Sequence, residues 1–332
     1  MDKLAFISGE TFIYWNSIFL TLAAAAAICF FLAFYIGKCG NAVAGFAVIP
    51  VSIVLSLIAG RFFHWYCRAD SYDSFTAAMT DYTFGGYALM GVFLGCFLAA
   101  CLTRLLFLQR NLPEMLDCMS IAGCAGIAVG RLASFFNSSD RGQIVESVQS
   151  LPFVYPVTNA VSGAQEYRLA TFVIQAMVAA VLLIILAVFY IRGNKRDKLR
   201  DGDTCLIFLL LYGASQVVLD STRYDSLFFR SNGFVSVVQV LGALGLALSI
   251  ILFSVRMVKA CGFKFWQILL WVLIAAGIGG AGFMEYYVQR RGNEAVFAYS
   301  VMSACLAAVI ALALLIRFLA VKTERRKEFS VG

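Results

Sequence analysis

The residue of this chain most suited to chemistry is Arg131, in the segment GRLASFFN at residues 130–137, where a long apolar run ends. A guanidinium near bilayer depth costs about 2.5 kcal/mol or more, so an intramembrane arginine is by default a functional residue. Its planar fork of N–H donors matches a phosphate. With Asn137 six residues on and Arg141 beyond, Arg131 is interpreted as a binding group for an anionic headgroup. The alternative is a structural ion pair at the membrane rim.

A second charged pair, Asp220 and Arg223, lies in the segment LYGASQVVLDSTRYD at residues 211–225. Residues three apart share one face of a helix, so a local ion pair is one account of these two side chains. The other account is that both line the same cavity as Arg131, with the carboxylate orienting the arginine towards a ligand.

His64 is the only histidine of the chain and follows the segment AGRFF at residues 59–63. Its titration range suits a general base. Its neighbours Trp65 and Tyr66 instead favour a residue of the aromatic belt at a membrane interface. Both interpretations stay open.

Glycines cluster in the segment GGYALMGVFLG at residues 85–95. Gly91 and Gly95 form a GxxxG pair, which lets two helices approach closely, and helix packing is the favoured interpretation. The alternative is that bare backbone at Gly86 and Gly91 lines a pocket for a lipid headgroup.

The elements that must position these residues are membrane helices. Apolar residues make up 61% of the chain and charged residues 14%, which excludes a soluble domain. With roughly 20 residues per span, the sequence predicts an all-α transmembrane bundle of about nine spans. The predicted spans are 12–36, 42–60, 85–108, 115–136, 169–191, 204–222, 233–254, 265–287 and 297–320.

The cysteines lie mostly inside these runs and form no CxxC pair, so we interpret them as small packing residues. Metal-binding and nucleotide-cradling motifs are missing, and we expect no cofactor.

Basic residues gather in alternate connections and in the tail, at 192–200, 256–264 and 322–327. Because such residues favour the cytoplasm, the N-terminus is predicted outside and the C-terminus inside. This topology accounts for the net charge of +7 without a nucleic-acid partner. The long connection at 138–168 then lies outside, at the same face as Arg131, and is expected to cover the mouth of the bundle.

Six segments in order resemble bacterial prolipoprotein diacylglyceryl transferases: WNSIFLTL from 15, AGRFF from 59, GGYALMGVFLG from 85, GRLASFFNSSDRG from 130, YGASQVVLDSTR from 212 and GFVSVVQVL from 233. The resemblance implies an enzyme of the bacterial plasma membrane. It would move a diacylglyceryl group from phosphatidylglycerol, or another anionic phospholipid, to the lipobox cysteine of a prolipoprotein signal peptide at the outer face. It covers roughly residues 12–255, so we expect a transferase-like domain at 1–257 and an added two-helix segment with a basic tail at 258–332.

The family signature GRxGNFxNxExxG is only partly matched here. Gly130, Arg131, Phe135, Asn137 and Gly142 fit the pattern. The signature asparagine is replaced by Ser134 and its glutamate by Ser139, while Asp140 offers a carboxylate one position later.

Two further family motifs are also altered. In the third span the family's histidine, proposed to take the proton of the incoming thiol, aligns with Met90, and a thioether is no base. In the sixth span the pattern YGxxRFxxExxR has Gln216 for its first arginine and Asp220 for its glutamate, while Arg223 is kept.

Diacylglyceryl transfer remains the leading hypothesis. In it Arg131 and Asp220 act in catalysis, His64 replaces the missing base, and Arg223, Gln216 and Ser134 help to bind the lipid. A second hypothesis is a non-enzymatic relative that binds a phospholipid or a lipoprotein segment. A third is a small-molecule permease, for which the glycine-rich run at 275–282 would have to form a broken helix.

Overall fold

The computed structural model describes residues 4–8, 11–39, 41–81, 86–106, 108, 111–137, 140–145, 153–158, 162–195, 199–229, 232–290 and 294–331. Within these ranges eight helices are long and apolar enough to cross a membrane. A ninth apolar helix, α4 (Leu89–Leu105), has only 17 residues. The protein is a polytopic helical bundle, as its composition predicts.

The long helices are α1 (Trp15–Cys39), α2 (Ala42–Cys67), α5 (Leu112–Gly130), α6 (Thr171–Lys195), α7 (Asp203–Ser221), α8 (Val237–Cys261), α9 (Phe265–Arg290) and α10 (Ala295–Val331). Short helical turns are η1 (Ala69–Ser71), α3 (Phe75–Thr80) and η2 (Arg131–Phe135). Three antiparallel hairpins pair β1 (Leu4–Ser8) with β2 (Thr11–Tyr14), β3 (Val154–Thr158) with β4 (Gln165–Leu169), and β5 (Phe228–Phe229) with β6 (Asn232–Ser236).

The hairpins correct the predicted span boundaries in two places. Residues 11–14 form β2, so the first span begins at Trp15 rather than at residue 12. Residues 232–236 form β6, and α8 begins at Val237 rather than at residue 233. Hydropathy did not separate these strands from the helices because β-branched and aromatic residues suit a strand as well as a membrane.

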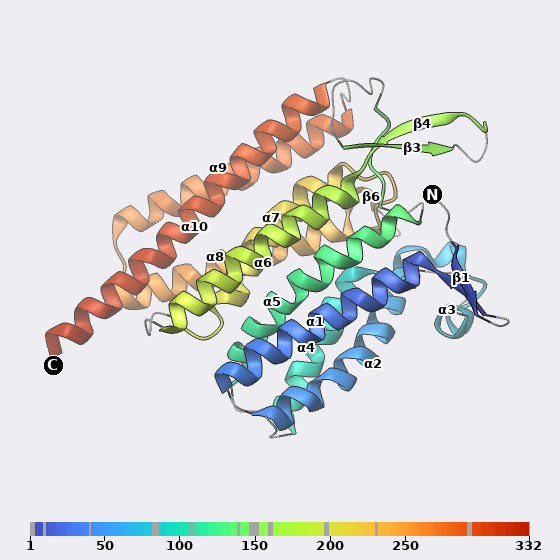
Figure 1. Cartoon of the computed structure of the whole chain (residues 1–332). Coiled ribbons are helices and arrows are strands. Elements are labelled where there is room, and N and C mark those ends of the chain that lie inside the picture. Colours follow the sequence, from blue (N-terminus) through green and yellow to red (C-terminus); the bar gives the residue numbers. More distant parts are fainter. Residues whose placement is uncertain are drawn as a thin grey trace. The chain divides into compact units, whose positions relative to one another are not determined.

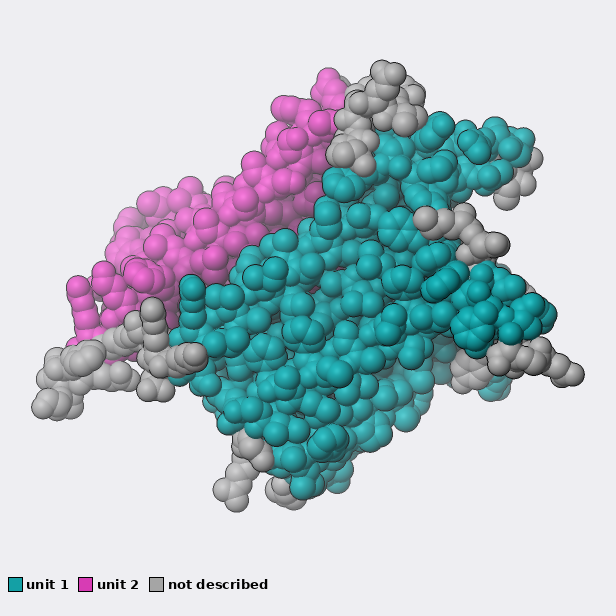
Figure 2. All heavy atoms as spheres, in the orientation of Figure 1, with its two compact units in different colours: residues 1–208, 222–238 teal, residues 209–221, 239–332 magenta. Residues whose placement is uncertain are grey.

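The chain divides into two compact units, coloured separately in Figure 2. Unit 1 comprises residues 1–208 and 222–238 and contains α1 to α6, the start of α7 and the three hairpins. Unit 2 comprises residues 209–221 and 239–332.

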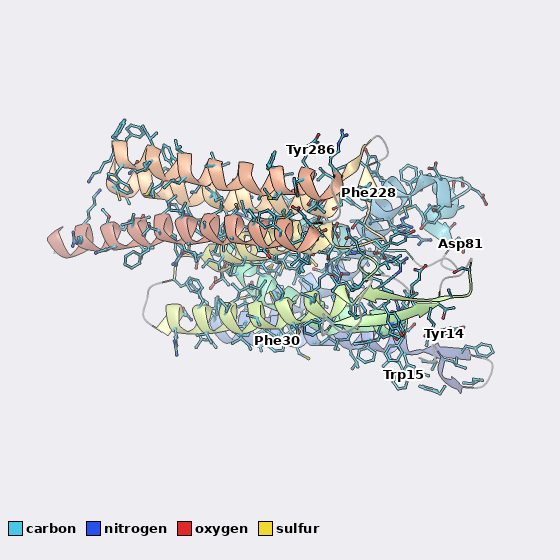
Figure 3. All side chains as sticks on the ribbon, turned by 90° about the horizontal axis from the view of Figure 1, so that it is seen from above. Tyr14, Trp15, Phe30, Asp81, Phe228 and Tyr286 are labelled. Atoms are coloured by element: carbon cyan, nitrogen blue, oxygen red, sulfur yellow. The ribbon has the colours of Figure 1, made fainter. Side chains whose placement is uncertain are left out.

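In unit 1 the hairpin β1–β2, helix α3 and the hairpin β3–β4 gather at one end of the helices, which we term the loop end (Figure 1). Figure 3 shows Trp15 and Asp81 at this end, with Phe30 further along α1.

Helices α2 and α4 pack closely because glycines leave room for backbone contact. A Cβ atom on Gly91 would collide with the carbonyl group of Ala59, and one on Gly95 would collide with the backbone of Ser56. Ser56 is buried in this contact and donates from Oγ to the carbonyl oxygen of Val92 at 3.1 Å. The GxxxG pair therefore serves helix packing, as its spacing predicts.

Buried polar contacts fix the end of unit 1 opposite the loop end. Asp117 of α5 is fully buried and accepts hydrogen bonds from the backbone N–H groups of Gly202 and Cys205 at 2.8 and 2.7 Å. It thus caps the first turn of α7, where such donors lack partners within the helix. Lys38 at the end of α1 lies 3.1 Å from Glu114, which ties α1 to the start of α5.

In unit 2, α9 and α10 form an antiparallel pair with small residues at their contact. A Cβ on Gly277 would meet the side chain of Val309 at 2.6 Å, and one on Gly280 would meet the sulfur of Cys305 at 3.1 Å. Helix α9 runs unbroken from Phe265 to Arg290. The glycine-rich run at 275–282 thus forms a packing surface and not the broken helix required by the permease hypothesis.

Candidate functional site: two arginines on one carboxylate

Arg131 and Arg223 converge on Asp140 at the loop end of unit 1. Nη1 of Arg131 and Nη2 of Arg223 each lie 2.7 Å from the same carboxylate oxygen, Oδ1 of Asp140. Ser134 donates from its hydroxyl to the other oxygen, Oδ2, at 2.8 Å. We name Arg131, Ser134, Asp140, Arg223 and Asp225 the arginine–aspartate cluster.

Asp225 completes the cluster from the side of Arg223. Its Oδ1 accepts from Nη2 of Arg223 at 3.0 Å, and its Oδ2 accepts from the backbone N–H of Asp140 at 2.7 Å. Asp140 has a φ of +61°, in the left-handed region that costs most side chains about 1 kcal/mol or more but that aspartate tolerates. The contact to Asp225 and the two guanidinium groups hold it there.

The charges in the cluster determine the ionisation of Asp140. Burial by itself would raise the pKa of this carboxyl group. The positive charges of Arg131 and Arg223 outweigh burial and, with the hydrogen bond from Ser134, hold the pKa of Asp140 well below its usual range. Asp140 is therefore a carboxylate at neutral pH and a poor proton acceptor.

Backbone pairing brings these distant parts of the chain together. Residue 142 forms an antiparallel bridge with Arg223, and the N–H of Gln143 donates to the carbonyl oxygen of Thr222 at 3.0 Å. On the other edge of this segment, the N–H of Gly142 donates to the carbonyl oxygen of Leu169, at the end of β4, at 2.7 Å. The segment 140–145 thus lies between β4 and the residues that follow α7.

Aromatic side chains anchor η2, which carries Arg131 and Ser134. Phe136 stacks on Trp15 and Phe19 of α1, with ring centroids 5.7 and 5.5 Å apart. Phe135 meets Phe172 of α6 edge to face at 4.8 Å. This helical turn is held between α1 and α6, so the position of Arg131 follows from apolar packing.

The structure corrects the expected position of Arg223 on the same helix as Asp220. Helix α7 ends at Ser221, so Arg223 lies beyond the helix and does not share a helix face with Asp220. Asp220 and Gln216 are buried residues of α7 in unit 2, whereas Arg223 belongs to unit 1. A helix-period argument failed here because the chain turns into a β-bridge directly after Ser221.

His64 lies in the last turn of α2, where Nδ1 is 2.8 Å from the hydroxyl oxygen of Tyr72. The N–H of Arg68, one turn further on, donates to the carbonyl oxygen of His64, and Nη2 of Arg68 donates to that of Asp225 at 3.2 Å. The end of α2 that carries His64 therefore contacts the arginine–aspartate cluster. Nε2 of His64 has no hydrogen-bond partner among the described residues.

Gly86 covers the ring of His64. Its φ is +151°, and a Cβ atom at this position would lie within 2.8 Å of three ring atoms of His64. The carbonyl oxygen of Gly86 accepts from the buried Arg61, which also donates to Ala78 and Asp81. Arg61 thereby ties Asp81, which follows α3, to Gly86, which precedes α4. Met90 follows in the first turn of α4.

The remaining sequence-derived residues fall in different places. The carbonyl oxygen of Asn137 accepts from Arg141 at 2.7 Å, so this residue supports the loop next to the cluster. Gly91 packs against α2, and Ser139 lies outside the described residues. Asp225 was not among the residues predicted from the sequence. Its position two residues after Arg223 was a usable signal, because residues two apart in extended chain share a face.

The fold and the cluster together define a polytopic membrane protein with a paired-arginine site at the ends of its helices. The family model described as prolipoprotein diacylglyceryl transferase matches residues 4–255, and the chain belongs to this family. At the family level its function is diacylglyceryl transfer.

Curated relatives agree at low sequence identity. A phosphatidylglycerol–prolipoprotein diacylglyceryl transferase of Clostridium kluyveri is 25% identical over 76% of this chain and 96% of its own length. The protein of the same name from Streptococcus sanguinis is 24% identical over 60% of this chain and 76% of its own length. A third protein of this name, from Streptococcus pneumoniae, is 25% identical over 63% of this chain and 77% of its own length.

Proposed function

We propose that this protein transfers diacylglyceryl from phosphatidylglycerol to the lipobox cysteine of a prolipoprotein, with the arginine–aspartate cluster holding the phosphate. Of the five N–H donors of Arg131, one has a partner among the described residues, the bond to Asp140. Its side chain is 13% exposed. Asp140 thus orients Arg131 and leaves most of its fork for a ligand, which is the observation that carries the proposal.

The chemistry of the step fits a site built from guanidinium groups. The cysteine sulfur forms a bond to the glyceryl carbon, the bond from that carbon to the phosphate oxygen breaks, and glycerol phosphate leaves. Negative charge develops on the leaving oxygen. Donors fixed in advance around such charge are worth about 10² to 10³ in rate for each donor, and Arg131 and Arg223 are fixed by Asp140 and Asp225.

The thiol proton needs an acceptor, because a free thiol with a pKa near 8.5 is only a few per cent ionised at neutral pH. We assign this role to His64, whose Nδ1 is bonded to Tyr72 and whose Nε2 is uncommitted within the described part of the chain. The contact from Arg68 to Asp225 supports a position beside the cluster. From the family resemblance, Asp220 stays a proposed catalytic residue and Gln216 a proposed lipid-binding residue. Gly86 and Gly91 are proposed to act indirectly, through His64 and α2.

The proposed setting is the bacterial plasma membrane, with the N-terminus outside and the C-terminus in the cytoplasm. The arginine–aspartate cluster then faces the outer leaflet, and the basic connections after α6 and α8 face the cytoplasm. The two-helix segment at 258–332 is proposed as an addition to the transferase domain, since the family match ends at residue 255.

A second candidate function is phospholipid or lipoprotein binding without turnover. The observation that favours it is Met90, which stands where the family resemblance expects the histidine base. Loss of a general base costs about 10² to 10⁴ in rate. Binding of an anion by Arg131 and Arg223 does not depend on that base and would be kept.

One experiment separates the two functions. The purified protein in nanodiscs is incubated with phosphatidylglycerol and a lipobox peptide, and the peptide is analysed by mass spectrometry. Transfer predicts a thioether-linked diacylglyceryl peptide that is missing with a cysteine-to-serine peptide. If the wild type gives no product while it still retains phosphatidylglycerol through Arg131, the binding function replaces the transferase.

A further inference from the structure

We infer that Arg141 and Arg168 form a second anion-binding subsite, beside the arginine–aspartate cluster, for the phosphate of a glycerophosphate. Both residues belong to unit 1, one in the segment 140–145 and the other in β4. Neither takes part in the ion pairs of Asp140. This inference deepens the proposed function, because it rests on glycerophosphate being the ligand class.

The two arginines each keep a buried donor without a partner. Nε of Arg141 and Nη1 of Arg168 are shielded from solvent and have no hydrogen-bond partner among the described residues. A buried donor left unsatisfied costs about 1 to 3 kcal/mol, and more when it is charged. Such groups are rare in proteins and point to a ligand or ion that is bound in the working state.

A closed set of contacts places the two side chains together. The guanidinium of Arg141 lies over the ring of Tyr155 at 4.5 Å, and Tyr155 is the cross-strand neighbour of Arg168. The guanidinium of Arg168 lies over the ring of Tyr224 at 4.3 Å, and the N–H of Tyr224 donates to the carbonyl oxygen of Arg141 at 2.9 Å. The two aromatic rings cover the flat faces of the guanidinium groups.

The charges around this pair are not balanced. Arg168 has one carboxylate partner, Glu166 at 2.9 Å, whereas Arg141 bonds to two neutral groups, the carbonyl oxygen of Asn137 and the hydroxyl of Tyr155. Burial lowers the pKa of Arg141, and the charge of Arg168 lowers it further. Tyr155 and, to a smaller extent, Asp225 oppose this effect. Tyr155 is neutral at pH 7, and the carboxylate of Asp225 is already bonded to Arg223 and to the backbone of Asp140. The pair therefore has room for a further negative charge.

A phosphate group, which offers several oxygen acceptors, fits these donors better than a single-atom anion such as chloride. Guanidinium edges bind phosphate oxygens through paired N–H groups. Arg141 directly follows Asp140, so an anion held here lies next to the cluster where glycerol phosphate would be released. The ligand is thus either the released glycerol phosphate or the headgroup of a second phospholipid, and both present the same phosphate chemistry.

The test uses the full chain in phosphatidylcholine nanodiscs and measures thermal unfolding with increasing glycerol phosphate. The wild type is expected to gain melting temperature. Arg141→Met and Arg168→Lys are expected to weaken the apparent affinity by about 10- to 100-fold, the loss expected for one charge-assisted hydrogen bond. Arg192→Gln, an exposed arginine near the far end of α6, is the matched control and should behave as the wild type.

A second arm replaces soluble ligand with phosphatidylglycerol in the nanodisc. Protection by the lipid alone, lost in Arg141→Met, identifies the headgroup as the ligand, and protection by glycerol phosphate identifies the released product. If neither ligand protects the wild type, or if Arg141→Met and Arg168→Lys are both protected as well as the wild type, the subsite does not exist.

Arg131→Gln distinguishes this inference from the proposed function. Glycerol phosphate should still protect that variant through the second subsite even when diacylglyceryl transfer is lost. If Arg131→Gln abolishes all protection, the arginine–aspartate cluster is the sole phosphate site and the inference is wrong.

Discussion

Nη1 of Arg131 and Oδ1 of Asp140 lie 2.7 Å apart, although the two residues belong to different local structures. Arg131 opens a helical turn anchored by aromatic rings, and Asp140 sits in left-handed backbone held by Asp225. Because Arg223 reaches the same carboxylate oxygen, Asp140 sets the distance between the two guanidinium groups that we propose as the phosphate-binding groups.

Asp140→Asn should destabilise the protein at neutral pH. The change leaves two partly buried guanidinium groups short of a counter-charge, and breaking such an arrangement costs about 3 to 5 kcal/mol when it is fully buried, so about 2 kcal/mol is expected here. The melting temperature should fall relative to the wild type. Asp73→Asn, which alters an exposed carboxylate, should leave it unchanged.

The same variant has a defined pH dependence. The folded-state pKa of Asp140 is depressed below its ordinary 3.8. Its stabilising contribution is therefore fully present above about pH 4 and is lost as the pH falls towards the folded-state pKa. The gap in melting temperature between wild type and Asp140→Asn should be constant from pH 7 to pH 5 and shrink below pH 4. A gap that widens on acidification would contradict this assignment.

Arg131→Lys should lower transfer although it keeps the positive charge. An ammonium group cannot present a planar fork to Asp140 and to a phosphate at once. We expect kcat/KM for lipobox-peptide lipidation to fall about 10²-fold, measured by quantitative mass spectrometry. Arg192→Lys is the matched control and should keep the wild-type kcat/KM. If Arg131→Lys is as active as Arg192→Lys, Arg131 does not bind the phosphate in the way proposed.

Gly91→Ala should disrupt the packing of α2 against α4. The new Cβ would collide with the backbone of Ala59, and overpacking of this kind costs about 1 to 3 kcal/mol or more. Gly123→Ala is the control, because a Cβ there meets nothing within 4 Å and alanine favours a helix by up to about 1 kcal/mol. The melting temperature should be lowest for Gly91→Ala, intermediate for the wild type and highest for Gly123→Ala. A Gly91→Ala variant that melts at or above the wild-type temperature would contradict the contact between α2 and α4.

Met90→His tests whether the missing base limits turnover. A histidine at this position restores the residue that the family resemblance expects, and a positioned base contributes about 10² to 10⁴ in rate. Transfer should rise in Met90→His, and His64→Gln should lower the wild-type rate but not that of the Met90→His variant. A wild-type rate unaffected by His64→Gln would exclude His64 as the proton acceptor.

Much of the fold followed from the sequence because membrane helices have one dominant signal, a long apolar run. The GxxxG contact of Gly91 and Gly95 was predictable for the same reason, since small residues determine how closely helices pack. The hairpins were not predictable from hydropathy. Strands such as β2 contain the same apolar residues as the helix that follows.

The site was predictable only in part. Arg131 and Arg223 stood out as charges in an apolar chain, and Asp140 was visible as a displaced carboxylate. The convergence of Arg223 with Arg131 was one of two accounts that the sequence left open. The sequence could not decide between them, because the convergence depends on backbone pairing of residues 142 and 143 with residues 222 and 223. The predicted helix face shared by Asp220 and Arg223 was wrong because a helix period was extended past Ser221, where α7 ends.

The most direct test of the paired-arginine site is lipid retention. Wild type, Arg131→Gln, Arg223→Gln and Arg192→Gln are purified from mixed phosphatidylcholine and phosphatidylglycerol, and bound lipid is counted by native mass spectrometry. The wild type and Arg192→Gln should retain phosphatidylglycerol in preference to phosphatidylcholine, and the two cluster variants should lose that preference while still folded. Equal retention of phosphatidylglycerol by wild type and both cluster variants would contradict the assignment of Arg131 and Arg223 to the headgroup phosphate.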